Sequence, residues 1–280
     1  MMKNKYLLAL AALTVPLWAQ AEALWGNDLA GDRKLPRTWG IGIDYFDMRQ
    51  PYALDSLQLV DTGVVDVDLG ALLLPDPSIL PIDNEIRHTD IKLDVWLTPF
   101  LNIFAIYGQI DGDTRINLSV LGLPLPPQTN ALTINYDGDV YGGGIVLAVG
   151  GDRWFASVTG TVTETSLSGD FESSVSATTI QPRFGLRFGD HTEFWIGGYL
   201  LEAEERHTGM IDLDLGLVGS MLPPPIDGLD VAFDVDLSQE EDFNLSFGTH
   251  MTWADAWEAT VEVGAGDRRT VLANFTYRFE

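Results

Sequence analysis

The sequence predicts an all-β fold, a transmembrane antiparallel up-and-down β-barrel of about ten strands with long extracellular β-hairpin loops. Three observations support this fold class. Apolar and polar residues alternate with period two over most of the chain. The alternating segments run to about 10–13 residues, whereas strands of soluble proteins usually have about 5–6. The connections between them are alternately short and long.

The alternation is clearest between residues 242 and 253. One face there carries Phe243, Leu245, Phe247, Thr249, Met251 and Trp253, and the other carries Asp242, Asn244, Ser246, Gly248, His250 and Thr252. A soluble sandwich would show the same period, with its apolar face inside. Aromatic residues near the ends of the apolar faces favour the membrane barrel, because they suit an interfacial girdle. The residues interpreted in this way are Trp39, Trp154, Trp195, Trp253, Trp257 and Phe279.

Ten strands are expected from this pattern. They lie near residues 37–48, 84–97, 100–111, 138–149, 152–164, 175–188, 191–204, 241–252, 256–265 and 268–279. Short joints such as Thr98-Pro99 and Gly150-Gly151 fall on one side, and extended loops near 49–83, 112–137 and 205–240 fall on the other. An even strand number puts both termini on the side of the short turns.

The N-terminal region has the features of a secretory signal. Lys3 and Lys5 precede an apolar run of about a dozen residues, and small residues at Ala19 and Ala21 suit a signal peptidase. We therefore expect a signal peptide at 1–21, with a second cleavage position after residue 23, and a periplasmic N-terminal segment at 22–36. The barrel would occupy 37–280.

Composition narrows the classes of function. The formal net charge of −25 argues against a nucleic-acid partner, which would need a basic surface. The absence of cysteine excludes disulfides and thiolate metal sites.

The final strand adds a more specific signal. Phe275, Tyr277 and Phe279 share one face, and this ending resembles the C-terminal aromatic signal of Gram-negative outer-membrane β-barrel proteins; Glu280 after it departs from the usual pattern. The resemblance implies residence in the outer membrane of a Gram-negative bacterium, contact with outer-membrane lipid, and recognition of the last strand by the barrel-assembly machinery. It identifies a general class and no particular family.

Inward-facing charges predict a largely plugged polar lumen, because about ten strands enclose a space that side chains mostly fill. An internal ion-pair network is one interpretation and a constricted path for a small solute is the other. The residues assigned to this network are Asp90, Lys92, Asp94, Arg183, Arg187, Glu202, His250, Glu258, Glu262 and Arg278. Arg183 and Arg187 are expected to face Glu202, while Glu258 and Glu262 neighbour Arg278.

Three of the long loops share a design in which an alternating stretch leads to an apolar, proline-rich tip. These loops are interpreted as hairpins that continue the barrel wall beyond the membrane. Their apolar faces would either pack on one another as a cap or contact a surface ligand or protein. The candidate ligand-binding residues at the tips are Leu72, Leu73, Leu74, Leu123, Leu125, Met221 and Leu222.

Two acidic pairs bracket the second loop, at Asp111 and Asp113 and at Asp137 and Asp139. Pairing of the two strands would bring their carboxylates close, and oxygen ligands suit Ca²⁺ better than a transition metal. The alternative interpretation is solvated surface charge. No other cofactor is predicted.

The sequence supplies no catalytic motif, and the chain is expected not to be an enzyme. His88 and His207 fall near the outer rim with Asp90 and Asp212 close in sequence, but no nucleophile elbow is present. Three hypotheses remain: a binding or structural module acting through acidic surface hairpins, a narrow channel or conduit for small hydrophobic solutes, and a surface hydrolase.

Overall fold

The structure, a computed structural model, describes residues 23–31, 35–61, 80–117, 119, 131–169, 171–214, 228–239 and 243–280. A short 3-10 helix, η1 (Asn27–Ala30), precedes eleven strands in these residues. The strands are β1 (Trp39–Asp61), β2 (Ile82–Thr98), β3 (Leu101–Asn117), β4 (Ala131–Gly150), β5 (Trp154–Gly169), β6 (Phe171–Phe188), β7 (Thr192–Asp214), β8 (Gly228–Gln239), β9 (Phe243–Trp253), β10 (Trp257–Ala265) and β11 (Arg269–Phe279). The expected signal peptide at 1–21 and the seven loop-tip residues lie outside the described residues.

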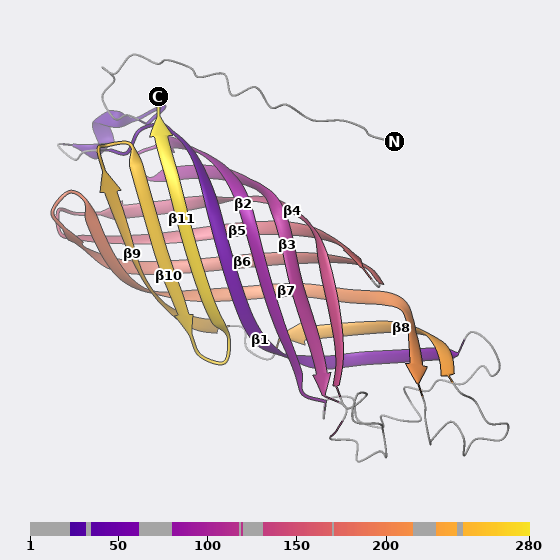
Figure 1. The fold of residues 1–280 in the computed structure, drawn as a ribbon. Coiled ribbons are helices and arrows are strands. Elements are labelled where there is room, and N and C mark those ends of the chain that lie inside the picture. Colours follow the sequence, from indigo (N-terminus) through magenta and orange to yellow (C-terminus); the bar gives the residue numbers. More distant parts are fainter. Residues whose placement is uncertain are drawn as a thin grey trace, which may run out of the picture.

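Ten of the strands form a closed antiparallel barrel (Figure 1). Consecutive strands pair from β1 to β7, β7 pairs with β9, and β9, β10 and β11 follow in order. The ring closes where β11 pairs with β1, from Trp39 opposite Phe279 to Arg49 opposite Arg269. The predicted up-and-down barrel of about ten strands is confirmed.

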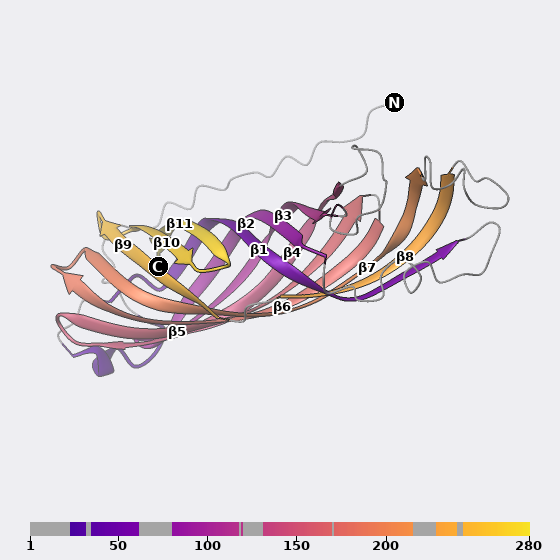
Figure 2. The ribbon, with the colours of Figure 1, turned by 90° about the horizontal axis from the view of Figure 1, so that it is seen from below.

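β8 was not expected as a separate wall strand. β7 pairs with β9 up to Leu200 and with β8 from Glu205 onward. β1 likewise pairs with β11 up to Arg49 and with β8 from Tyr52 onward. One strand, β8, therefore takes the place of β9, β10 and β11 between β7 and β1, so that β1 to β8 form a second ring of paired strands, the eight-stranded ring. β1 pairs with β2 only as far as Tyr52, and its end beyond Tyr52 pairs with β8 alone. Figures 1 and 2 show β8 between β1 and β7 at the end of the barrel away from the C terminus.

The outer face of the ten-stranded part is an apolar belt. Alternate residues of each strand are large, apolar and exposed, among them Ile41, Ile43, Ile91, Leu93, Tyr107, Ile145, Val162, Phe184, Ile196, Phe247, Val261 and Phe275. Trp39, Trp154, Trp253 and Trp257 are exposed near the short turns. The opposite faces carry the polar residues, and this inside-out pattern is the one that a lipid environment requires of a barrel. In the described part of the chain no helix is long and apolar enough to cross a membrane.

Candidate functional site: the lumen

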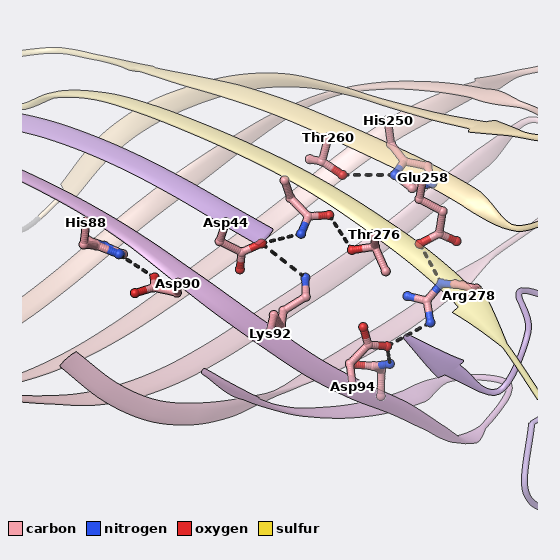
Figure 3. A network of polar contacts seen from close by, with 12 residues as sticks. Asp44, His88, Asp90, Lys92, Asp94, His250, Glu258, Thr260, Thr276 and Arg278 are labelled. Carbon is pink, nitrogen blue, oxygen red and sulfur yellow. Dashed lines mark hydrogen bonds and ion pairs between the residues drawn. The ribbon is translucent and has the colours of Figure 1, made fainter. Parts of the chain in front are cut away.

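The lumen near the chain termini holds a buried arginine between two carboxylates (Figure 3). Arg278 of β11 lies 2.8 Å from Asp94 of β2 and 2.6 Å from Glu258 of β10. Asn102 of β3 also donates a hydrogen bond to Asp94 at 2.7 Å. These contacts connect four strands across the mouth of the barrel, because each side chain comes from an inward-facing position of its strand.

A second group of polar contacts lies further along the same side of the lumen. Asp44 of β1 accepts a hydrogen bond from Asn274 and lies 3.9 Å from the Lys92 ammonium group. His250 shares a 3.0 Å hydrogen bond with Thr260. These contacts give polar groups of β1, β2 and β9 to β11 partners within the protein, which a low-dielectric interior favours.

A third contact reaches between strands that are not neighbours. The Arg183 Nε atom of β6 lies 2.7 Å from Glu262 Oε2 of β10, although β7 and β9 separate these strands in the wall. The Trp195 indole of β7 donates to the same carboxylate at 2.9 Å, and the Arg183 guanidinium lies over its ring. This bond runs through the lumen rather than along the wall.

Beyond the polar groups, apolar side chains pack on one another inside the barrel. Phe46 and Met48 of β1 pack with Tyr199 and Leu201 of β7, and the Phe46 and Tyr199 rings stack at 6.1 Å. Partly buried residues from β2, β6, β7 and β11 complete this cluster: Ile86, Ala177, Ala203 and Leu272. A second cluster, Ile110, Tyr136 and Leu167, joins it through Ile86. We call these two clusters the apolar layer.

The junction between the ten- and eight-stranded parts is closed by side chains. β7 residues between Leu200 and Glu205 have no backbone ladder with β8 or β9. Gln239 fills this gap, because its side-chain amide donates to the Leu201 carbonyl at 2.6 Å and accepts from the Ala203 N–H at 3.2 Å. On the β1 side, the buried Arg268 donates to Gln50 at 2.6 Å and lies over the Tyr199 ring.

The predicted lumen residues are placed inward with one exception. Glu202 is exposed on the outer face of β7, so its assignment to the network is corrected. Arg183 contacts Glu262 instead, and Arg187 lies 2.7 Å from Glu193. Trp195, expected in the outer girdle, is buried in the lumen. Both errors arise from β7, whose outward residues (Phe194, Ile196, Leu200) and inward residues (Trp195, Tyr199, Leu201) are apolar alike, so that period two does not identify the faces.

Sequence reasoning missed Gln239, Gln50 and Arg268. Their role depends on the place where β8 takes over from β9, β10 and β11. No local sequence pattern indicates that place. A polar residue at the end of an alternating stretch was the only signal available.

The acidic pairs of the predicted calcium site lie on adjacent strands. Asp111 of β3 is opposite Asp137 of β4, and Asp139 is opposite Gln109. Asp111 and Asp139 are exposed, and the Tyr107 hydroxyl donates to Asp139 at 3.4 Å. Among the residues that the structure describes, no group of three or more His, Cys, Asp or Glu residues could hold a metal ion.

The histidines considered for catalysis are dispersed. His88 Nδ1 lies 2.5 Å from Asp90 Oδ2 inside the lumen, and its ring packs on Phe46 at 4.8 Å. His191 lies in the turn before β7, and His250 is in the polar network. The backbone of His207 pairs with Ser173 and Val235, but its side chain is outside the described part. Among the histidine side chains that the structure describes, only that of His88 therefore has a carboxylate partner of the kind a general base uses.

A ladder of outward charges lies on β1 to β3 beyond the apolar belt. Arg87 contacts Glu85 and lies 3.3 Å from Asp47 and 3.9 Å from Asp111. Arg49 lies 2.8 Å from Glu85. The hydrogen bond from Arg87 lowers the pKa of Glu85, and the same contact raises the pKa of Arg87.

Comparisons with known proteins give only remote likenesses. No protein-family model and no curated protein matches the chain. Among solved structures, the translocator domain of the autotransporter NalP from Neisseria meningitidis is 12% identical, with a TM-score of 0.38, and the match covers 90% of this chain and 91% of that one. The transport unit of the autotransporter AIDA-I from Escherichia coli is 11% identical, with a TM-score of 0.39 and coverage of 93% and 95%. The toluene transporter TbuX from Ralstonia pickettii is 8% identical, with a TM-score of 0.33 and coverage of 87% and 90%.

These scores are too low to carry an argument about function. The closed barrel and its outward apolar belt are themselves the architecture of Gram-negative outer-membrane β-barrels, and the chain has that architecture.

Proposed function

We propose that the protein is a barrel of the Gram-negative outer membrane that is closed to solutes and supports extended surface hairpins for binding. The observation that carries the proposal is the set of contacts through the lumen. Arg183 and Glu262 meet across two intervening strands, and beyond them Phe46 and Tyr199 stack between β1 and β7. A path for hydrated solutes would have to displace both an ion pair and a packed apolar layer, and each is costly to open.

The distribution of charge supports a role for the outer surface. In the described lumen the carboxylates of Asp44, Asp90, Asp94, Glu193, Glu258 and Glu262 are nearly balanced by Lys92, Arg183, Arg187, Arg268 and Arg278. The chain as a whole has 41 acidic against 16 basic residues, so almost all of its excess negative charge belongs to residues other than these. Such a surface favours cationic partners, or anionic ones bridged by divalent cations.

Single-channel recording tests whether the lumen is closed. The refolded protein is expected to give a silent planar bilayer with and without millimolar Ca²⁺. A variant carrying Phe46→Ala, Tyr199→Ala, Arg183→Ala and Glu262→Ala lacks both the ion pair and part of the apolar layer, and it is expected to conduct. Stable openings of the unmodified protein would overturn the proposal.

The binding role needs its own experiment. Three internal deletions, of residues 70–76, 121–127 and 219–226, remove the apolar tips. Binding of a fluorescent amphipathic peptide of leucine and lysine to the refolded barrel is expected to fall in these variants, because the peptide loses its apolar contacts with the tips. Barrel folding, followed by circular dichroism, is expected to be retained. Unchanged binding in all three would contradict a role for the hairpin tips.

A second candidate is a narrow conduit for small hydrophobic solutes. It is favoured by one observation: the apolar layer lies beside the junction where Gln239 side-chain bonds replace the backbone ladder of β7. Under this hypothesis cells with the protein accumulate radiolabelled naphthalene faster than deletion cells. Equal accumulation would remove this candidate and leave the first.

A further inference from the structure

The segment before β1 is folded against the end of the barrel. The Leu24 N–H donates to the Trp96 carbonyl at 3.0 Å, and the Trp25 N–H donates to the Leu97 carbonyl at 2.9 Å. Asn27 holds the segment in a tight loop, because its amide accepts from the Ala23 N–H at 2.8 Å and donates to the Ala23 carbonyl at 3.0 Å.

A left-handed glycine sets the direction of this loop. Gly26 has φ 73°, and an added Cβ there would lie 3.2 Å from the Leu29 side chain and 3.9 Å from Pro99 in the β2–β3 turn. Ala23 and Ala30 are buried. One side of the segment therefore packs on the protein, and η1 lies at the same end of the barrel as the C terminus (Figure 1).

The other side of the segment carries large apolar side chains that nothing in the described structure covers. Trp25 is 64% exposed, Leu29 is 62% exposed, and Leu24 is 41% exposed. Beside them are Phe100, exposed at the β2–β3 turn, and Trp39, exposed at the start of β1. Trp39 and Phe100 belong to the rim of the apolar belt, so the exposed side of the segment continues the surface that faces lipid.

We propose that residues 23–31 form a membrane-interface anchor, in which Leu24, Trp25 and Leu29 insert into the phospholipid leaflet at the short-turn end. Continuity with the lipid-facing belt identifies phospholipid as the occupant. A tryptophan with leucines suits the boundary between head groups and acyl chains, because the indole is apolar with one polar N–H. The segment thus widens the contact of the barrel with the membrane on this side.

Because the chain has no cysteine, single cysteines give a clean probe of this contact. Leu29→Cys in the full chain is labelled with an environment-sensitive fluorophore and refolded into vesicles containing lipids that carry a nitroxide near the head group. Ile91→Cys, in the belt, is the positive control, and Asp190→Cys, in the short turn before β7, is the aqueous control. The Leu29→Cys label is expected to be quenched as strongly as the label on Ile91→Cys.

A label at position 29 that behaves like the label at position 190 would overturn the proposal, and it would point instead to a periplasmic protein as the occupant. A second variant, Trp25→Cys, guards against a local effect of the first substitution and should give the same result. Circular dichroism of each labelled protein verifies that the barrel has folded. Neither result depends on whether the lumen conducts, so this test is independent of the proposed function.

Discussion

At the scale of single residues, Glu262 joins two other strands through one buried carboxylate. Its side chain is 5% exposed, and its carboxylate accepts hydrogen bonds from Arg183 and from the Trp195 indole. Removing one partner of a buried ion pair leaves the other uncompensated, which costs about 3–5 kcal/mol. Glu262→Ala is therefore expected to lower the free energy of unfolding by about that amount, measured by urea titration of the barrel in lipid vesicles.

The exposed Glu202 supplies a matched control for this prediction. Glu202→Ala should change the free energy of unfolding by about 0.5 kcal/mol or less, because it removes no buried partner. The double variant Arg183→Ala, Glu262→Ala should be less destabilised than the sum of the two single variants. Equal losses for Glu262→Ala and Glu202→Ala would mean that the bond through the lumen contributes nothing.

Gly248 leaves room for the Trp195 ring to lie close against the barrel wall. A Cβ on Gly248 would lie 2.2 Å from the Trp195 ring, so Gly248→Ala forces the indole away from Glu262. We expect a loss of about 1–3 kcal/mol in the same titration. Gly160→Ala is the control, because its Cβ meets nothing closer than 4.0 Å. A Gly248→Ala barrel as stable as the Gly160→Ala barrel would show that Trp195 adjusts without cost.

The outward ladder of charges should give a weak dependence on pH. The pKa of Glu85 is lowered in the folded protein from its usual value of 4.5. Its ion pair therefore stabilises the fold above about pH 4.5, and this contribution is lost as the pH falls through the lowered value. The stability difference between the protein and Glu85→Gln should be small at pH 7, since the partners are exposed, and should shrink as the pH falls below 4.5. A difference that grows on acidification would contradict this assignment.

At the scale of elements, the weakest part of the wall is the stretch of β7 that Gln239 bridges. Gln239→Ala leaves the Leu201 carbonyl and the Ala203 N–H without their partners, at about 1–3 kcal/mol for each group left unsatisfied. The expected result is faster hydrogen exchange at Ala203 with little change in the rest of the barrel. Gln109→Ala, exposed on β3, should leave the exchange of Ala203 unchanged. Slow exchange at Ala203 in both variants would show that residues other than Gln239 protect this stretch of β7.

The elements also show how far the sequence could be interpreted. β9, β10 and β11 alternate strongly enough for their faces to be predicted, and their inward residues follow directly from this alternation. β7 is the exception, because its inward residues near Tyr199 and Leu201 are apolar like its outward residues, and the two faces become alike. β8 was predicted as the returning half of a hairpin. Its place between β7 and β1 depends on pairing between residues that are far apart in sequence, which periodicity does not report.

At the scale of the whole molecule, the barrel closes twice. The ten-stranded ring closes through β1 and β11, and the eight-stranded ring closes through β1 and β8. The two closures share β1 to β7 but use different residues of β1 and β7. The ten-stranded ring therefore contains all the pairings that it needs without β8.

This independence predicts that β8 can be removed. Joining Leu201 to Asp242 through Asn-Gly deletes β8 and turns β7 and β9 into a hairpin that continues their existing pair, Leu200 with Phe243. Asn-Gly suits a two-residue hairpin turn. The shortened chain is expected to refold in vesicles and to give the β-strand circular dichroism spectrum of a barrel. The Arg183–Glu262 ion pair is expected to be retained, so Glu262→Ala should destabilise the shortened chain as much as it destabilises the full chain. If the shortened chain fails to fold while a variant lacking only residues 219–226 folds, the eight-stranded part is required for assembly and the two closures are a single cooperative unit.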